Sequence, residues 1–245
     1  MSGNREVFEH FKSVLDDMIH NHPFWAFYFQ NPYSMDCDAA AGNSVEVHCG
    51  ASRGCLVDSD YEWVVKWNLT DSGYDENYCE IESEIYENAV AAGLGESFAA
   101  VRYAGTYRTK VKTWTQSSIF DVDDDGWYFD GTDEDFLNFI SRYGFTDDDM
   151  EEVEIEVPLW QAVKAQTAFD MDYSDADEEY ASQHQSPLSE RSTEIGGMFV
   201  ADYGADWYDA LTHFLNEWNV NDIHFGNIGF MGKRVILIDY AGYHC

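Results

Sequence analysis

Hydrophobic residues recur at helical and then at strand spacing through the first hundred residues of the chain. Over residues 4–20, apolar side chains lie three or four positions apart, which predicts a helix that ends at Pro23. An aromatic, turn-rich connection is expected over 24–42. Alternating or continuous apolar runs within 44–69, separated by Gly, Asp and Ser, predict three strands of an antiparallel meander. Residues 77–92 return to helical spacing, and a long strand or hairpin is expected over 98–116.

The second half of the chain begins with a strongly acidic segment, residues 113–192, whose only positive residues are Arg142, Lys164 and Arg191. Within it the pattern predicts a short helix over 134–145 and a strand over 153–165. After it, residues 206–218 have the spacing of an amphipathic helix. A loop, a short strand, a turn and a buried strand that ends at Asp239 follow. Helices and antiparallel strands in this order predict an α+β fold.

The net charge of the chain excludes some classes of binding partner. The 245 residues include 13 Lys plus Arg and 47 Asp plus Glu, so the formal net charge is 13 − 47 = −34. A field of this sign repels phosphate backbones and anionic membrane surfaces, so we expect neither direct nucleic-acid binding nor membrane binding. A hydrophobic content of 45% excludes a disordered acidic tail. With no apolar run long enough to span a bilayer, no visible signal peptide and five cysteines without a CxxC pair, a cytoplasmic protein with free thiols is expected.

The acidity itself has two interpretations. Solubility, or adaptation to high salt, accounts for it without a partner. Alternatively, an acidic surface imitates nucleic acid and occupies the binding groove of a basic protein. Composition does not separate the two.

Three polar residues near the end of the chain have a spacing suited to phosphoryl transfer. Asp222 and Asn227 lie five apart after the predicted helix, and Asp239 follows the next apolar strand. Transfer from ATP needs one carboxylate to orient or deprotonate the acceptor hydroxyl. It also needs an amide and a second carboxylate to hold Mg²⁺ against the phosphates. The combination of helix, loop, strand and terminal Asp is more specific than the D-x-x-x-x-N spacing alone.

A glycine-containing turn between the first two predicted strands could contact phosphates. Gly50 and Gly54 permit close backbone approach, and Ser52 and Arg53 can donate hydrogen bonds to phosphate oxygens. Twelve residues further on, Lys66 interrupts an apolar strand. The alternative for this lysine is a solubilising residue on an edge strand.

The helix after this lysine carries several glutamates, of which Glu82 and Glu84 are candidates to pair with Lys66 by spacing and by proximity to the apolar stripe. The order of glycine turn, lysine strand, glutamate helix, NDIHFGN loop and VILIDYAG strand resembles the protein-kinase-like fold. The DIHFGN loop is similar to the D-x-H-x-x-N loop of aminoglycoside and choline phosphotransferases. The segments GAS…VVKW and NDIHFGNIGF…VILIDYAGY also resemble small kinase-like proteins of bacteriophage genomes, which implies the cytoplasm of a host.

The resemblance covers about residues 43–105 and 153–243 and implies a role for each matched residue. Lys66 would contact the α and β phosphates of the nucleotide and pair with Glu82 or Glu84. Asp222 would be the catalytic base.

The same resemblance implies the positions of the metal and of the base. Asn227 and Asp239 would ligate Mg²⁺. The segment 159–163, with Gln161 and Val163, would be the hinge that receives the adenine of ATP.

The expected architecture is a bilobal kinase-like fold. Residues 1–110 would form an N-lobe with a leading helix and an antiparallel sheet. Residues 111–245 would form the acidic insertion, the hinge strand and a minimal helical C-lobe without a platform for a peptide substrate. The expected function is an ATP- and Mg²⁺-dependent phosphotransferase acting on a host protein or a small molecule. The alternative is an inactive pseudokinase-like protein that inhibits a basic host protein, a nucleic-acid-binding or defence protein, by charge mimicry.

One rival site lies in the acidic segment. Residues 121–126, DVDDDG, match the opening of a calcium loop, whose alternate oxygens can face one cation. The twelfth position of an EF-hand loop is Glu, and here it is Thr132. A calcium loop and a solvated acidic turn therefore both remain open for this segment.

Overall fold

The chain divides into two compact units, each formed from two separate segments of sequence. Unit 1 comprises Met1–Cys79 and Arg102–Ala162, and unit 2 comprises Glu80–Val101 and Val163–Cys245. The computed structural model describes residues 2–30, 32, 39–40, 44–49, 52–69, 77–116, 133–167, 194–221 and 223–241.

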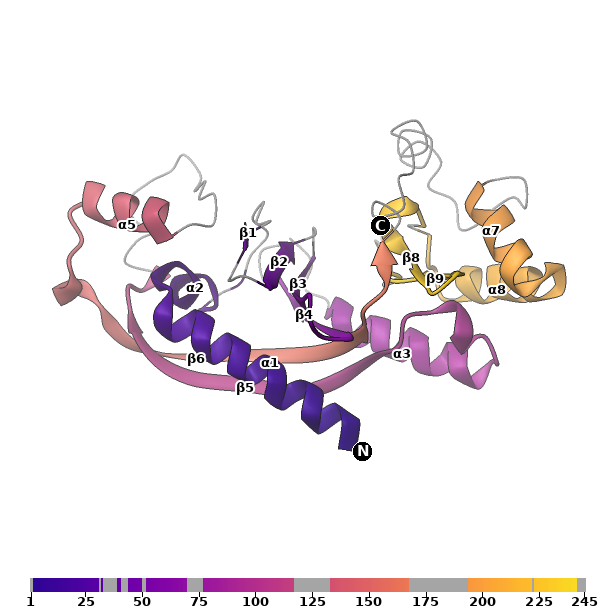
Figure 1. The fold of residues 1–245 in the computed structure, drawn as a ribbon, viewed down its shortest axis with the longest axis horizontal. Helices are drawn as coiled ribbons and strands as arrows, with labels where there is room; N and C mark the ends of the chain where they lie inside the picture. The colour runs from indigo at the N-terminus through magenta and orange to yellow at the C-terminus, as the bar shows by residue number, and fades with distance from the viewer. Residues whose placement is uncertain are drawn as a thin grey trace. The chain divides into compact units, whose positions relative to one another are not determined.

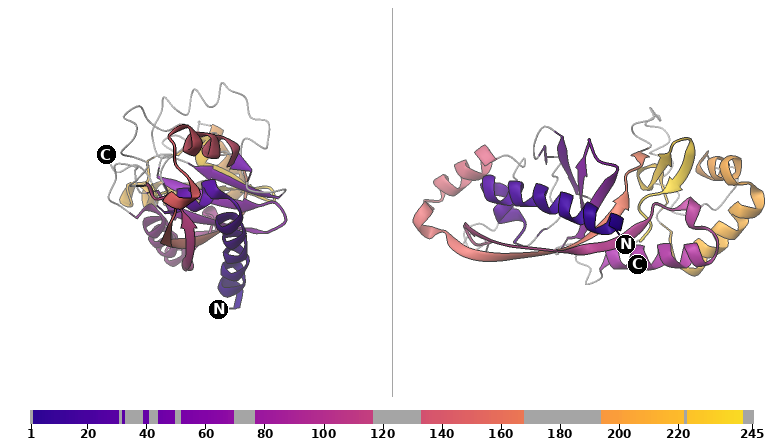
Figure 2. Two further views of the ribbon diagram at one scale, coloured as in Figure 1. Left: turned by 90° about the vertical axis from the view of Figure 1, so that its left-hand side faces the viewer. Right: turned by 60° about the horizontal axis from the view of Figure 1, so that its bottom comes forward.

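Unit 1 is built on a six-stranded sheet with the strand order β1-β2-β3-β4-β6-β5. Its strands are β1 (Ala39–Ala40), β2 (Val45–Cys49), β3 (Arg53–Asp58), β4 (Trp63–Asn68), β5 (Val101–Thr113) and β6 (Glu151–Val163). Its helices are α1 (Ser2–Asn21), α2 (Pro23–Tyr28), α5 (Asp133–Arg142) and the short 3₁₀ helix η2 (Asp147–Asp149). Neighbouring strands from β1 to β4 pair antiparallel, which confirms the predicted meander. Strands β5 and β6 run side by side and curve together (Figure 1, Figure 2).

The hydrophobic core of unit 1 lies between the two N-terminal helices and one face of the sheet. Helix α1 contributes the apolar stripe that its spacing predicts, including Phe11 and Leu15, both fully buried. From the sheet, Val65 and Trp67 belong to the same core cluster. Burial of large side chains at about 1.5 to 3 kcal/mol each is what stabilises a helix on a sheet in this way.

One expectation for unit 1 is corrected. The segment after Pro23 is not simply a connection, because residues 23–28 form the helix α2 and its aromatic residues are buried. Pro23 suits the first turn of a helix, and the carboxylate of Asp133 accepts the Phe24 N–H at 3.0 Å and contacts His22 Nδ1 at 2.8 Å. Of the long strand or hairpin expected over 98–116, the structure has the long strand, β5, which confirms the first alternative.

Unit 2 combines helices with a small antiparallel sheet of strand order β7-β8-β9. Its elements are α3 (Tyr78–Ala91), η1 (Gly95–Ser97), β7 (Gln166–Thr167), α7 (Glu194–Tyr203), α8 (Ala205–Glu217), η4 (Phe225–Asn227), β8 (Ile228–Met231) and β9 (Arg234–Leu237). Helices α3 and α8 and the hairpin of β8 and β9 match the sequence prediction. Helix α7, which packs against α8 (Figure 1), was not predicted.

The protein is therefore α+β, as its sequence predicts, with an antiparallel sheet and several helices. Part of the acidic segment belongs to the sheet of unit 1, since β6 lies between β4 and β5. No helix in the described ranges is long and apolar enough to cross a bilayer.

Candidate functional site

One face of the β2–β4 meander gathers the polar residues that the sequence assigns to phosphate contacts. Cys55 lies directly opposite Lys66, and Arg53 lies opposite Asn68. Residues paired across a ladder point to the same side, and so do alternate residues along one strand. Arg53 and Lys66 therefore share a face, as diagonal neighbours on adjacent strands. The opposite face carries the buried Val65 and belongs to the core.

Lys66 lies on an interior strand of the sheet. Strand β4 has β3 on one side and β6 on the other, so the interpretation of Lys66 as an edge-strand residue is wrong. The side chain is half-buried, between the fully buried Val65 and Trp67. A lysine at an interior position of a sheet places its charge beside neighbouring strands, which suits contact with an anionic group at that face.

Arg53 is held by an aromatic ring of the same unit. Its guanidinium lies over the ring of Tyr78, 5.9 Å from the centroid. Such a contact orients a cation without neutralising it. Ser52 is buried, and its carbonyl accepts the N–H of Leu69 at 2.9 Å, which ties the end of the turn to the end of β4.

Gly54 lies within β3 rather than in the turn, and its lack of a side chain has a packing reason. A Cβ at this position would lie 2.3 Å from the Trp67 ring, because Gly54 is paired with Trp67 across the ladder. The ring occupies the space that any side chain would need. Gly50, the other glycine of the predicted phosphate turn, lies outside the described residues.

Two valines beside Lys66 were missed by the sequence analysis. Val57 is paired with Val64, two positions from the Cys55–Lys66 pair, so both share the face of Lys66 and Arg53. Apolar side chains next to cations on one face suit a ligand with a flat apolar part and an anionic part. Counting alternate positions in from Lys66 along β4 would have identified Val64.

The predicted hinge coincides with a division between the two units, which falls between Ala162 and Val163. Gln161 belongs to β6, and its side chain is buried. The N–H of Val163 donates to the carbonyl of Ala100 at 3.3 Å within unit 2.

In unit 2, the two candidate glutamates of α3 differ sharply. Glu82 is 0% exposed, and its Oε1 accepts the backbone N–H of Tyr240 at 3.2 Å. Glu84 is exposed to solvent. A buried carboxylate requires partners, and here one of them is the residue directly after Asp239. Lys66 belongs to unit 1, so its pairing with Glu82 or Glu84 stays a prediction.

The loop before β8 is held by a histidine. The N–H of Gly226 donates to Nδ1 of His224 at 3.0 Å, and the N–H of Asn227 donates to the His224 carbonyl at 2.9 Å. Because Nδ1 accepts a hydrogen bond, a neutral ring carries its proton on Nε2. His224 therefore caps η4 and fixes the backbone that leads into Asn227.

The hairpin of β8 and β9 brings the two predicted magnesium ligands together. Ile228 is paired with Leu237, so the residues that flank this pair meet at the same end of the hairpin. The carbonyl of Asn227 accepts the N–H of Ile238 at 2.9 Å and the N–H of Asp239 at 3.4 Å. An amide and a carboxylate at this end supply oxygen donors of the type that Mg²⁺ prefers.

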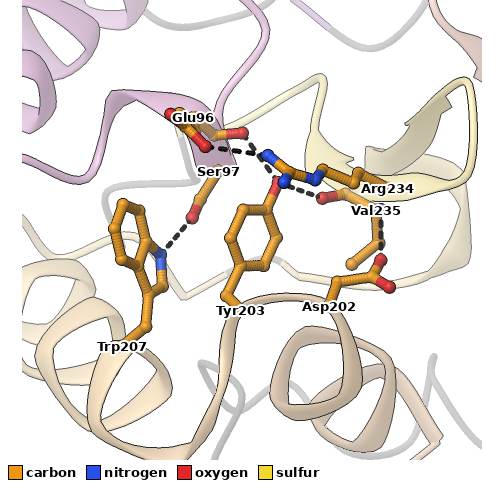
Figure 3. A network of polar contacts seen from close by, with 7 residues as sticks. All are labelled: Glu96, Ser97, Asp202, Tyr203, Trp207, Arg234 and Val235. Atoms are coloured by element: carbon orange, nitrogen blue, oxygen red, sulfur yellow. Dashed lines mark hydrogen bonds and ion pairs between the residues drawn. The ribbon is translucent and has the colours of Figure 1, made fainter.

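The strand that leads to Asp239 is tied down by side chains of α7 (Figure 3). Asp202 accepts the N–H of Val235 at 2.8 Å, and the hydroxyl of Tyr203 contacts the Val235 carbonyl at 2.9 Å and the Glu96 carbonyl at 2.7 Å. Burial raises the pKa of Tyr203 to about 12. The side chains of α7 thus form hydrogen bonds with the backbone N–H and C=O of Val235 in β9, which a neighbouring strand would otherwise have to supply.

Around this contact, two further bonds attach η1 to the same network (Figure 3). Arg234 forms an ion pair with Glu96 at 2.9 Å, and Trp207 Nε1 donates to the Ser97 hydroxyl at 2.6 Å. The ring of Trp207 also stacks on that of Tyr203. The network accordingly joins α7, α8, η1 and β9 within unit 2.

Two predicted sites lie outside the described residues: the catalytic base Asp222 and the calcium-loop candidate 121–126. Among the described residues, no group of three or more His, Cys, Asp or Glu side chains is arranged to hold a metal ion. Cys49 and Cys55 are partly exposed, and neither forms a disulfide with a described residue.

Comparison of the chain with protein-family models, with curated proteins and with solved structures found no match. The resemblance to the kinase-like fold therefore stays a prediction from the sequence motifs.

Proposed function

We propose that this protein is an ATP- and Mg²⁺-dependent phosphotransferase of kinase-like fold. The observation that carries the proposal is the meeting of Asn227 and Asp239 at one end of the β8–β9 hairpin, through the bonds from Ile238 and Asp239 to the Asn227 carbonyl. These bonds bring together the backbones of residues twelve positions apart in the sequence, which supports their binding one metal ion. Phosphoryl transfer requires such a pair beside the catalytic base, for which Asp222 is the candidate.

The phosphate contacts in this proposal belong to the polar face of the meander. Arg53 and Lys66 share that face, and the partly exposed Val57 adds an apolar side chain next to them, with the buried Val64 beside it. In a chain with 13 positive residues against 47 negative ones, two cations on one face are suited to compensate the charge of a triphosphate. The hinge segment with Gln161 and Val163 would receive the adenine.

The acceptor is a hydroxyl of a host protein or of a small molecule. Its oxygen would form the new bond to the γ-phosphorus, the bond from that phosphorus to the β–γ bridging oxygen would break, and the hydroxyl proton would pass to Asp222. ADP is then the leaving group.

Thermal unfolding with and without ATP and Mg²⁺ tests the proposal. A ligand that binds the folded state at a hundred times its Kd stabilises it by about 2.7 kcal/mol, so the wild type should melt at a higher temperature with MgATP. Asp239→Asn should abolish that increase, whereas Asp209→Asn, an exposed change on α8, should retain it. Absence of any increase in the wild type at millimolar MgATP would contradict nucleotide binding.

A second candidate function is inhibition of a basic host protein by charge mimicry. It is favoured by the exposed acidic residues that surround η2, namely Asp147, Asp148, Asp149, Glu151 and Glu152. The Thr146 N–H and hydroxyl lower the pKa of Asp149, which keeps that carboxylate charged. Binding to a basic partner should weaken steeply with salt and survive Asp239→Asn. Salt-insensitive binding, or loss of binding in Asp239→Asn, would count against mimicry.

A further inference from the structure

Strand β5 lies at one edge of the sheet of unit 1, as far as the described residues show. Strand β5 spans 13 residues, and β6 is its one neighbour among the strands that the structure describes. A strand at the edge of a sheet presents backbone N–H and C=O groups to which another extended chain can bond.

Positive charge is concentrated on this same strand. Four of the 13 positive residues of the chain lie within Val101–Thr113, and the strand contains no acidic residue. They are Arg102, Arg108, Lys110 and Lys112, all of them exposed. Arg108, Lys110 and Lys112 are alternate residues, which the alternation of a strand directs to one face of the sheet. In a protein of net charge −34, this local excess of positive charge is unlike the remaining surface.

Strand β6, the neighbour of β5 in the sheet, supplies acidic side chains that pair with the cations of β5. Arg108 forms a two-pronged ion pair with Glu156 at 2.7 and 2.8 Å, and Lys110 lies 3.9 Å from Glu154. The Arg108 pair uses Nε and Nη2, so Nη1 has no hydrogen bond to any described residue. Lys112 likewise has no ion pair within the described ranges. Each of these cations therefore has donors left for a carboxylate on the other side of β5.

An exposed aromatic residue lies at the opposite end of the strand. Tyr103 is 52% exposed, and one side of its ring contacts Trp160 of β6 at a centroid distance of 5.6 Å. Tyrosine and arginine are the residue types enriched in binding surfaces.

We propose that the open edge of β5 binds an extended acidic peptide, which adds to the sheet as a further strand. Alternate carboxylates of the peptide would face Arg108, Lys110 and Lys112 on one side, as Glu156 and Glu154 do on the other. Charge complementarity selects this occupant. A second copy of β5 would bring cations opposite cations, and a basic peptide would do the same, which is unfavourable across a ladder.

The experiment measures binding of a labelled, capped peptide with alternating acidic residues, Glu-Thr-Glu-Val-Glu-Thr-Glu, by fluorescence anisotropy. Two matched peptides replace every Glu by Gln or by Lys. The acidic peptide should bind the full chain, more tightly at low than at high ionic strength, and slow the hydrogen exchange of β5 amides. The variant Lys110→Gln/Lys112→Gln should weaken binding about tenfold or more. The variant Arg5→Gln/Lys12→Gln, which removes two positive charges from α1 instead, should bind like the wild type.

Several results would overturn the proposal. They are equal binding of the Gln peptide, tighter binding of the Lys peptide, no binding of any peptide, or equal losses in the two double variants. Concentration-dependent dimerisation with protection of β5 would identify a second copy as the occupant and would equally overturn it. Arg5, Lys110 and Lys112 are exposed and Lys12 is half-buried, and circular dichroism should report unchanged folding for both variants.

Discussion

The two units hold their candidate residues in different ways. In unit 1, Arg53 and Lys66 share a face because three strands pair in a continuous register, so many backbone bonds fix their positions together. In unit 2, bonds between a side chain and a backbone group hold the neighbours of the candidate residues: Glu82 accepts the N–H of Tyr240, and His224 accepts the N–H of Gly226. In a strand ladder, many backbone bonds share in fixing the position of a residue, whereas a side-chain bond fixes it at one point. Point substitutions at these bonds should therefore disturb unit 2 more than exposed changes nearby.

The largest effect is expected at the buried glutamate of α3. Glu82→Ala removes the acceptor of the Tyr240 N–H and leaves a cavity, and we expect a loss of about 2 to 4 kcal/mol in the free energy of unfolding. Urea unfolding, with hydrogen exchange of the Tyr240 amide as a local probe, measures the effect.

Glu84→Ala is the matched control on the same helix. This residue is exposed, so its replacement should change the free energy of unfolding by less than about 0.5 kcal/mol. Equal effects of the two changes would show that the bond to Tyr240 does not hold the end of the strand, and would remove the contrast between the units.

A pair of glycines offers the next comparison. Gly54→Ala would place a Cβ 2.3 Å from the ring of Trp67, which should cost about 1 to 3 kcal/mol through overpacking. Gly197→Ala, inside α7, meets no atom within 4 Å and should instead stabilise by up to about 1 kcal/mol. Thermal unfolding measures both. A neutral Gly54→Ala would mean that the Trp67 ring can move away, so that packing does not explain this glycine.

The contrast between local ladders and long-range side-chain bonds also explains what could be predicted from the sequence. Strand and helix periodicity depends on neighbouring residues, so α1, the meander, α3 and α8 followed from spacing, and so did the candidate Lys66. Spacing along α3 left Glu82 and Glu84 as equals. Burial and the bond to Tyr240, 158 positions further on, distinguish them in the folded protein.

Two other features depended on contacts that no local pattern contains. Helix α7 includes Gly196 and Gly197, which weaken the helical signal, and it is supported by bonds from Asp202 and Tyr203 to Val235 and by packing on α8. The glycine at position 54 suggested a phosphate turn, whereas its packing partner Trp67 becomes evident only from the register of β3 and β4.

An intermediate effect with a pH dependence is expected at Tyr203. Its hydroxyl is tied to two carbonyls, so Tyr203→Phe should cost about 1 kcal/mol at neutral pH. The pKa is raised from 10.0 to about 12 in the folded state, so the stability that this group contributes is present below pH 10 and is lost as the pH rises from 10 to 12. The urea midpoint of the wild type should therefore fall towards that of Tyr203→Phe over this range. Tyr103→Phe, on the exposed β5, serves as the control, and a difference independent of pH would contradict the assignment.

The smallest effect is expected at the cap of η4, where it tests whether single bonds matter even in a loop. His224→Ala removes the acceptor of the Gly226 N–H and should cost a few tenths to about 1 kcal/mol, while His224→Asn supplies another capping acceptor and should retain most of the stability. Hydrogen exchange at the Gly226 and Asn227 amides is the direct measurement. Faster exchange in His224→Ala with rescue in His224→Asn would show that the ring acts through its acceptor. Equal acceleration in both variants would mean that the ring acts by packing instead, and the loop would then resemble unit 1, where shape and register rather than one bond hold a residue in place.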